Sequence, residues 1–230
     1  MNIKLIFSTL VIACAPCVYS SESAAWPIVY EGKTHPLDAG SVKFFGQEAK
    51  EFSAPAKGNY LVEVQADGLK FEFPAAGTFG LELADQTYNF NEGTTVECRL
   101  RLEETVNQID PPTKNSSAVM IQFSEPAGND PGLWSLGFYT DSEDGKNYAV
   151  LEGANSTVPY EIGKEFRTYR VVTKDNLATL IVDGVVVGEV KPRKGLQAVG
   201  LRFGNLRGKD HSGSAVLESI RIDPTQALMP

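Results

Sequence analysis

Histidine and cysteine are scarce in this 230-residue sequence, which contains two histidines and three cysteines. Cys14 and Cys17 fall in or beside an apolar N-terminal segment, so Cys98 is left alone and no disulfide can form within the remaining chain. A metal site of clustered histidine and cysteine is excluded, because the ligands are missing. The alternation of Cys98 with apolar neighbours predicts a small buried side chain, and a nucleophilic role would need a partnered base.

Long hydrophobic runs and helical periods are also missing. After the N-terminal segment, no stretch is apolar for long enough to span a bilayer, so no transmembrane span is expected in the mature chain. Basic residues are outnumbered by acidic ones, 21 to 29, which gives a formal net charge of −8. This charge argues against nucleic acid as a partner and favours neutral or weakly charged ligands.

The N-terminal segment has the layout of a secretory signal peptide. Lys4 precedes an apolar run from Leu5 to Ala13, and small residues follow. Two forms of processing stay open: release after Ser20, or a bacterial lipoprotein signal that ends before Cys14 and makes Cys14 a lipid anchor. We therefore expect an exported bacterial protein, either secreted or held in the cell envelope. Loss of residues 1–20 removes Lys4 alone among the charged residues.

Alternating apolar and polar residues dominate the chain after the signal. The clearest case is Thr94 to Leu102, in which Val96 and Leu100 oppose charged neighbours. Residues 166–190 are expected to form a meander of three strands at 166–173, 177–182 and 185–190, interrupted at Asp175-Asn176 and Asp183-Gly184, which are residues typical of tight hairpin turns. Further strands are expected at 26–30, 41–45, 60–65, 69–73, 78–83, 117–123, 133–140, 147–152, 196–203 and 214–222, with loops at 104–116, 124–132 and 153–164.

These strands predict an all-β fold in which residues 21–230 form a single domain of two packed antiparallel sheets. The order of the blocks resembles the concanavalin A-like lectin/glucanase superfamily, in particular its laminin G-like branch. The similarity covers roughly residues 26–223 and lies in GTTVECRLRL, NSSAVMIQF, GLWSLGFYTD, KNYAVLEG, the meander, GLRFGN and SGSAVLESIRID.

The resemblance implies a jelly-roll β-sandwich whose concave sheet holds carbohydrate in many members. These members include lectins, binding modules, β-glucanases and polysaccharide lyases. The Glu-x-Asp-x-x-Glu strand motif of the glucanases is absent from this sequence. Its absence argues against that hydrolase mechanism, which needs two carboxylates at a fixed separation.

Glu97, Arg99 and Arg101 alternate along one strand, so their side chains share one face. Jelly-roll alginate lyases carry a similar Arg/Glu row, whose guanidinium groups neutralise the uronate carboxylate. This chain departs from those enzymes, because Gln122 has no histidine two residues later and the final strand is not tyrosine-rich. A solvated face of alternating charge is the alternative interpretation of the row.

Four residues form the candidate glycan-contacting set. Trp134 shares parity with apolar neighbours and is expected in the core, whereas Tyr139 lies on a face of small residues that could form a groove. Tyr148 and Tyr169 are further aromatic candidates for stacking on sugar rings. The set consists of Arg101, Gln122, Tyr139 and Arg202.

The catalytic candidates are Arg101 as charge neutraliser and Tyr139 or His211 for the proton. Both histidines, His35 and His211, are expected in loops, with His211 in an exposed turn before the last strand.

Members of the superfamily often hold a structural calcium ion with a last-strand carboxylate and an acid near the N-terminus. Glu218 shares parity with apolar residues of the last strand, and Glu31 is the candidate second ligand. An arginine partner would explain Glu218 equally well. The acidic segment 141–145 resembles a calcium loop but is expected to be a hairpin turn.

Three functions stay open from the sequence. The first is an exported module that binds a polysaccharide, and the second is a polysaccharide lyase or glycoside hydrolase of the jelly-roll type. The third is an envelope or adhesion module without a sugar ligand.

Overall fold

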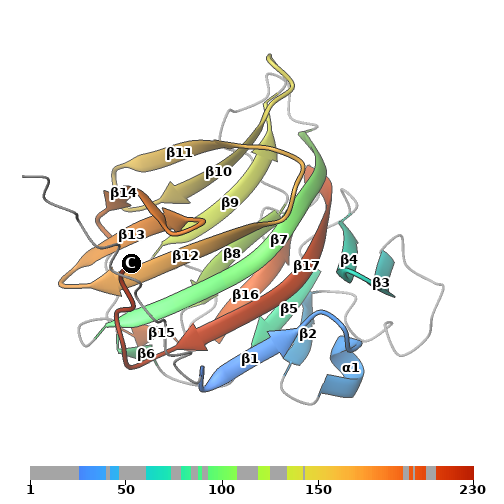
Figure 1. The fold of residues 1–230 in the computed structure, drawn as a ribbon, viewed down its shortest axis with the longest axis horizontal. Helices are drawn as coiled ribbons and strands as arrows, with labels where there is room; N and C mark the ends of the chain where they lie inside the picture. The colour runs from blue at the N-terminus through green and yellow to red at the C-terminus, as the bar shows by residue number, and fades with distance from the viewer. Residues whose placement is uncertain are drawn as a thin grey trace, which may run out of the picture.

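Two antiparallel β-sheets stack face to face around an apolar core (Figure 1). The computed structural model describes residues 26–39, 42–46, 61–73, 79–83, 88–89, 93–107, 119–124, 134–141, 143–193, 197–198, 200–205 and 211–230. The predicted all-β sandwich is confirmed. The proposed signal, with Cys14 and Cys17, lies outside the described residues.

One sheet has eight strands. Its order is β14 (Val185–Val190), β13 (Leu177–Val182), β12 (Arg167–Lys174), β7 (Thr94–Asn107), β17 (His211–Asp223), β4 (Gly68–Phe73) and β3 (Leu61–Gln65), and β1 (Ile28–Glu31) also pairs with β17. The first and last parts of the described chain therefore lie side by side at β1 and β17.

The other sheet has seven strands. Its order is β11 (Thr157–Ile162), β10 (Asn147–Glu152), β9 (Ser135–Thr140), β8 (Val119–Ser124), β16 (Gly200–Asn205), β5 (Phe79–Leu83) and β2 (Val42–Gly46). A short ladder joins β6 (Tyr88–Asn89) to β15 (Gln197–Ala198), and the one-turn helix α1 spans Pro36–Ala39. Among the described residues, no helix is long and apolar enough to cross a bilayer.

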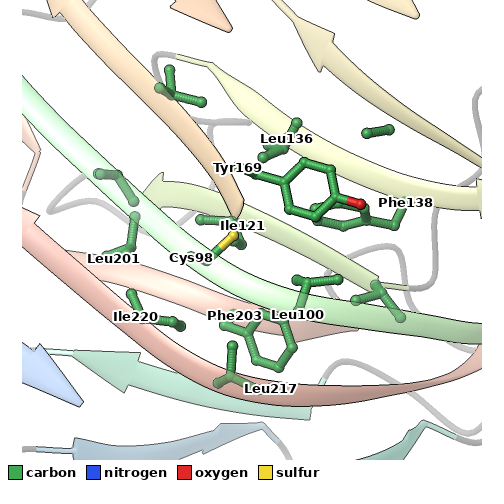
Figure 2. Packing of buried hydrophobic residues seen from close by; sticks show 14 of the residues in the cluster. Cys98, Leu100, Ile121, Leu136, Phe138, Tyr169, Leu201, Phe203, Leu217 and Ile220 are labelled. Atoms are coloured by element: carbon green, nitrogen blue, oxygen red, sulfur yellow. The ribbon is translucent and has the colours of Figure 1, made fainter. Parts of the chain in front are cut away.

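Every second side chain of the central strands enters the space between the sheets, where aromatic rings pack edge to face (Figure 2). The ring centroids of Phe71 and Phe203 are 5.2 Å apart, and those of Phe138 and Tyr169 are 4.9 Å apart. Trp134 is fully buried, as expected, and its Nε1 donates a hydrogen bond to Thr173 Oγ1 at 3.0 Å. Tyr169 is therefore a core residue, and burial raises the pKa of its hydroxyl.

Two tight turns of the meander have the expected backbone. Asp175 and Asn176 have φ angles of 50° and 63°, and Asp183 and Gly184 have φ angles of 49° and 83°. Consecutive positive φ values are typical of the type I′ turns that match strand twist. The carboxylate of Asp183 also accepts a hydrogen bond from the backbone N–H of Thr168 at 2.9 Å.

A β-bulge in β17 corrects the predicted position of Glu218. Leu217 pairs with Leu100 while Ser219 pairs with Arg99, so Glu218 is the extra residue between them. The insertion reverses the parity of the strand, and Glu218 points outward instead of into the core. Its partner is Arg99, whose Nε lies 2.7 Å from Glu218 Oε2.

Several predicted boundaries are wrong. β11 lies inside the expected loop 153–164, because it is an edge strand and an edge strand tolerates the missing N–H of Pro159. β7 continues to Asn107, beyond the expected end at Leu102. β17 begins at His211, which is buried at 4% exposure instead of lying in an exposed turn.

We expect Phe203→Ala to lower the free energy of unfolding by about 3–5 kcal/mol, because it leaves a cavity beside Phe71. Val186, which is 48% exposed on β14, offers a matched truncation, and Val186→Ala should cost less than about 1 kcal/mol. Urea unfolding followed by tryptophan fluorescence measures both values. Equal losses would contradict the packing described here.

Cys98 should be chemically silent in the folded protein, because it is buried at 1% exposure and burial raises the pKa of its thiol well above the usual value. In a variant with Cys14 and Cys17 replaced by serine, we expect a thiol-specific reagent at pH 8 to modify the unfolded chain and to spare the native one. Rapid modification of the native protein would show that Cys98 is accessible.

Candidate functional site

A row of polar residues crosses the outer face of the seven-stranded sheet. Adjacent strands pair Glu82 with Arg202, Arg202 with Gln122, Gln122 with Ser135, and Ser135 with Glu152. We call these five residues the polar row. Their strand neighbours Leu81, Phe203, Ile121, Leu136 and Leu151 enter the core, so the polar row must face outward.

The polar row is held together by ion pairs and hydrogen bonds. Arg202 Nε lies 3.4 Å from Glu82 Oε1, and both side chains are about one-quarter exposed. Glu152 is buried; its Oε2 accepts a hydrogen bond from Ser135 Oγ at 3.1 Å and lies 3.5 Å from Arg193 Nη2. A buried carboxylate is stable only with such partners, so Arg193 is committed to Glu152.

A stacked pair of tyrosines lies further along the same face. The ring centroids of Tyr139 and Tyr148 are 5.4 Å apart with an interplanar angle of 20°. The hydroxyl of Tyr148 donates to Asp144 Oδ2 at 3.0 Å, and this bond raises the pKa of Tyr148. Lys146 Nζ lies 2.6 Å from Glu161 Oε2, and the pair raises the pKa of Lys146. Tyr139 and Tyr148 are called the tyrosine pair below.

Glycine occupies three of the positions between the polar row and the tyrosine pair. Gly80 pairs with Gly204, Gly204 with Met120, and Met120 with Gly137. A Cβ atom at Gly80 would lie 2.0 Å from the carbonyl oxygen of Phe203, so this position requires glycine. Met120, Val150 and Tyr139 are buried. Glu82, Arg202, Gln122 and Tyr148 are partly exposed, and Thr157, Pro159 and Glu161 of the edge strand β11 are exposed on the same face.

The candidate glycan-contacting set is divided between the two sheets. Gln122 and Arg202 are direct cross-strand partners, and Tyr139 lies on the same outer face but is 8% exposed, so the expected open groove at Tyr139 is wrong: its ring is stacked against Tyr148. Arg101 lies on the outer face of the eight-stranded sheet, where it contacts Asp67 at 3.1 Å and lies 4.8 Å from the Phe166 ring centroid. A layer of core side chains separates Arg101 from the other three, so it cannot act with them.

The outer face of the eight-stranded sheet is an array of ion pairs. Arg170 Nη2 lies 2.7 Å from Glu97 Oε2, and Arg99 is paired with Glu218. The row of Glu97, Arg99 and Arg101 is therefore a charged face in which each member has a partner, as the alternative interpretation expected.

The C-terminal segment crosses this same face. Thr95 Oγ1 donates to the carbonyl of Gln226 at 2.7 Å and accepts from the N–H of Leu228 at 2.9 Å. Arg170 donates to the Leu228 carbonyl at 3.2 Å. In Figure 1 the C-terminus lies in front of β12 and β13. Part of this face is thus occupied by the chain itself.

The two calcium candidates each have a guanidinium partner. Arg221 lies 3.6 Å from Glu31 Oε1, and Arg99 pairs with Glu218. Within the described ranges, no group of three His, Cys, Asp or Glu side chains could hold a metal ion. Calcium at Glu31 and Glu218 stays a prediction. The segment at 141–145 forms the expected turn, in which Gly145 N–H donates to the Asp141 carbonyl at 2.8 Å.

His211 does not belong to the polar row, because it is the first residue of β17, which lies in the eight-stranded sheet. Its carbonyl accepts a hydrogen bond from Asn205 Nδ2 at 2.9 Å. His35 precedes helix α1, and its carbonyl accepts from the N–H of Asp38 at 2.9 Å.

Sequence reasoning missed Glu82, Ser135, Glu152 and Arg193. Glu82 has a signal, because it stands alone between Leu81 and Leu83 in a short apolar strand. Glu152 is the last residue of β10 and gives no comparable signal in the sequence. Arg193 lies in the segment after β14, and only the folded structure brings it close to Glu152.

Comparison with known proteins gives structural matches only. No model of a protein family matches the sequence, and neither does any curated protein. The alginate lyase AlgAT5 from polysaccharide lyase family 7 is 11% identical with a TM-score of 0.56, over 81% of this chain and 95% of that one. A family 7 alginate lyase in complex with substrate is 16% identical with a TM-score of 0.54, over 90% of this chain and 99% of that one.

Two further matches differ in extent. The laminarinase catalytic domain from Thermotoga maritima is 9% identical with a TM-score of 0.52, over 86% of this chain and 96% of that one. A sialidase is 11% identical with a TM-score of 0.48, and the match covers 71% of this chain but 16% of that protein's length. At such identities the likeness concerns architecture. Together with the order of the strands, it shows that this chain has the concanavalin A-like jelly-roll fold.

Proposed function

We propose that this chain binds a polysaccharide on the outer face of its seven-stranded sheet. The observation that carries the proposal is the presence of the polar row and the tyrosine pair on one face. Sugar hydroxyls both donate and accept hydrogen bonds, and amide, guanidinium and carboxylate groups offer the complementary atoms. The ring of Tyr148, which is partly exposed, adds apolar contact area for the face of a sugar ring.

The spacing of these groups favours an extended ligand. Tyr139 lies four residues along β9 from Ser135, which corresponds to about 14 Å in an extended strand. A single sugar ring cannot reach from Gln122 to the tyrosine pair. An oligosaccharide of several rings can, and its affinity should therefore rise with chain length.

The N-terminal segment supports an extracellular setting for such binding. An apolar run behind Lys4 and the small residues before Ser20 are typical of exported proteins. We propose that the protein is secreted or held in the envelope of a bacterium, with Cys14 as the anchoring residue if the lipoprotein form of processing applies. The laminin G-like branch is the corresponding proposal for its place in the superfamily.

Polysaccharide cleavage is the second candidate. Two of the matched structures bear the names of alginate lyases, and Arg202 beside Gln122 could neutralise a carboxylate. Hydrolysis by Glu82 and Glu152 is disfavoured, because four strand spacings separate them by about 19 Å. Paired carboxyl groups of glycosidases are about 5–9.5 Å apart.

Binding and cleavage can be tested on one panel of polysaccharides, by calorimetry and by detection of shortened products. We expect Gln122→Ala and Arg202→Ala each to weaken binding about tenfold, since each removes polar contacts worth about 1.4 kcal/mol. Arg101→Ala is the matched control on the opposite sheet, and it should leave the affinity unchanged.

Each result has a distinct meaning. Shortened products that disappear in Arg202→Ala would establish a lyase or hydrolase. Binding that is lost in Arg101→Ala and kept in Arg202→Ala would contradict the proposed face. If no polysaccharide binds, the adhesion function without a sugar ligand takes its place.

A further inference from the structure

We propose that the polysaccharide is neutral and not a polyuronate; this inference rests on the proposed function above. It follows from the charges on the outer face of the seven-stranded sheet. In the part of the chain that the structure describes, the ion pairs on this face are Arg202 with Glu82, Arg193 with Glu152, and Lys146 with Glu161. These three cations are therefore already neutralised by carboxylates of the protein, and a fourth cation, Lys43 of β2, lies on the same face directly opposite Glu82.

Among the cations of this face whose side chains the structure describes, Arg202 is best placed to meet a ligand, since it lies in the accessible end of the polar row. Its Nε is 3.4 Å from Glu82 Oε1, on the adjacent strand. A uronate carboxylate would compete with Glu82 for the same guanidinium group and would repel Glu82 as well. A sugar hydroxyl can accept a hydrogen bond from the guanidinium without such repulsion.

Arg193 cannot serve an anionic ligand either. Glu152 is only 5% exposed, so the loss of its cation would leave a buried carboxylate without charge compensation. Removing one partner of a buried ion pair is strongly destabilising, because the other charge is left without compensation. The interaction of a ligand carboxylate with Arg193 would have to offset this loss of stability before it contributed to affinity.

The tyrosine end of the face adds negative charge. Asp144 accepts hydrogen bonds from the backbone N–H of Lys146 at 2.9 Å and from Tyr148 at 3.0 Å, and these bonds lower its pKa. Asp144 therefore stays ionised at neutral pH beside the ring that would stack on a sugar. The net charge of −8 for the whole chain also repels a polyanion at low ionic strength.

The test compares polymers that differ in charge alone. Alginate and pectate are each paired with their carboxyl-reduced forms, in which every uronate becomes a neutral hexose, and neutral glucans and mannans complete the panel. We expect every bound polymer to be neutral, and any bound reduced polymer to bind at least tenfold more tightly than its parent polyuronate. Calorimetry at low and high salt measures both affinities.

A gain of affinity provides a second test. Glu82→Gln should free Arg202 and raise alginate affinity at least tenfold, with a gain that shrinks at high salt. Asp67→Asn is the matched control, because it makes the same change of charge beside Arg101 on the opposite sheet. It should leave alginate binding as in the wild type. Thermal unfolding confirms that both variants fold.

Two outcomes would overturn the inference, and they are distinguishable. If the wild type binds a polyuronate more tightly than the reduced form, the ligand is anionic, while polysaccharide binding on this face still stands. If none of the panel binds to the wild type, the proposed function fails and the inference falls with it.

Discussion

The pairing of two sheets through alternate apolar side chains is the constraint on which the rest of this structure depends. Once Phe138, Phe203 and Tyr169 are committed to the space between the sheets, the antiparallel register decides the direction of every neighbouring side chain. The polar row exists because its members alternate with core residues on five adjacent strands. Burial of apolar surface is the dominant favourable term in folding, so this assignment of faces is strongly specified.

A single inserted residue shows how sensitive that assignment is. The bulge at Glu218 converts a carboxylate that simple alternation would bury into a surface ion pair with Arg99. Without the insertion, an unpaired charge would face the core at high cost. Apolar residues on both sides of the bulge still enter the core, because the extra residue resets the parity between Leu217 and Ile220.

Much of the fold could be predicted from local patterns, because alternation and turn residues act over a few positions. The strands at 147–152, 177–182 and 185–190 have the predicted bounds. The candidate site was predicted only in part, since Gln122 and Arg202 are adjacent and Arg101 is not. Membership of a sheet depends on pairing between distant strands, and the alternation within one strand contains no information about it. Edge strand β11 was missed for a related reason: Pro159 is tolerated only because one side of that strand is unpaired.

The two outer faces differ in the polar groups that remain available to a ligand. On the eight-stranded sheet, Thr95 and Arg170 bind the backbone of the C-terminal segment, and neighbouring charges are paired across strands. Surface ion pairs contribute little to stability, about 0–1 kcal/mol each, but they leave few donors for a partner. On the seven-stranded sheet, Gln122 is an uncharged amide beside the Arg202 and Glu82 pair, and it is partly exposed. An amide can donate and accept at once, as a sugar hydroxyl does, so this face has the more suitable chemistry for a neutral glycan.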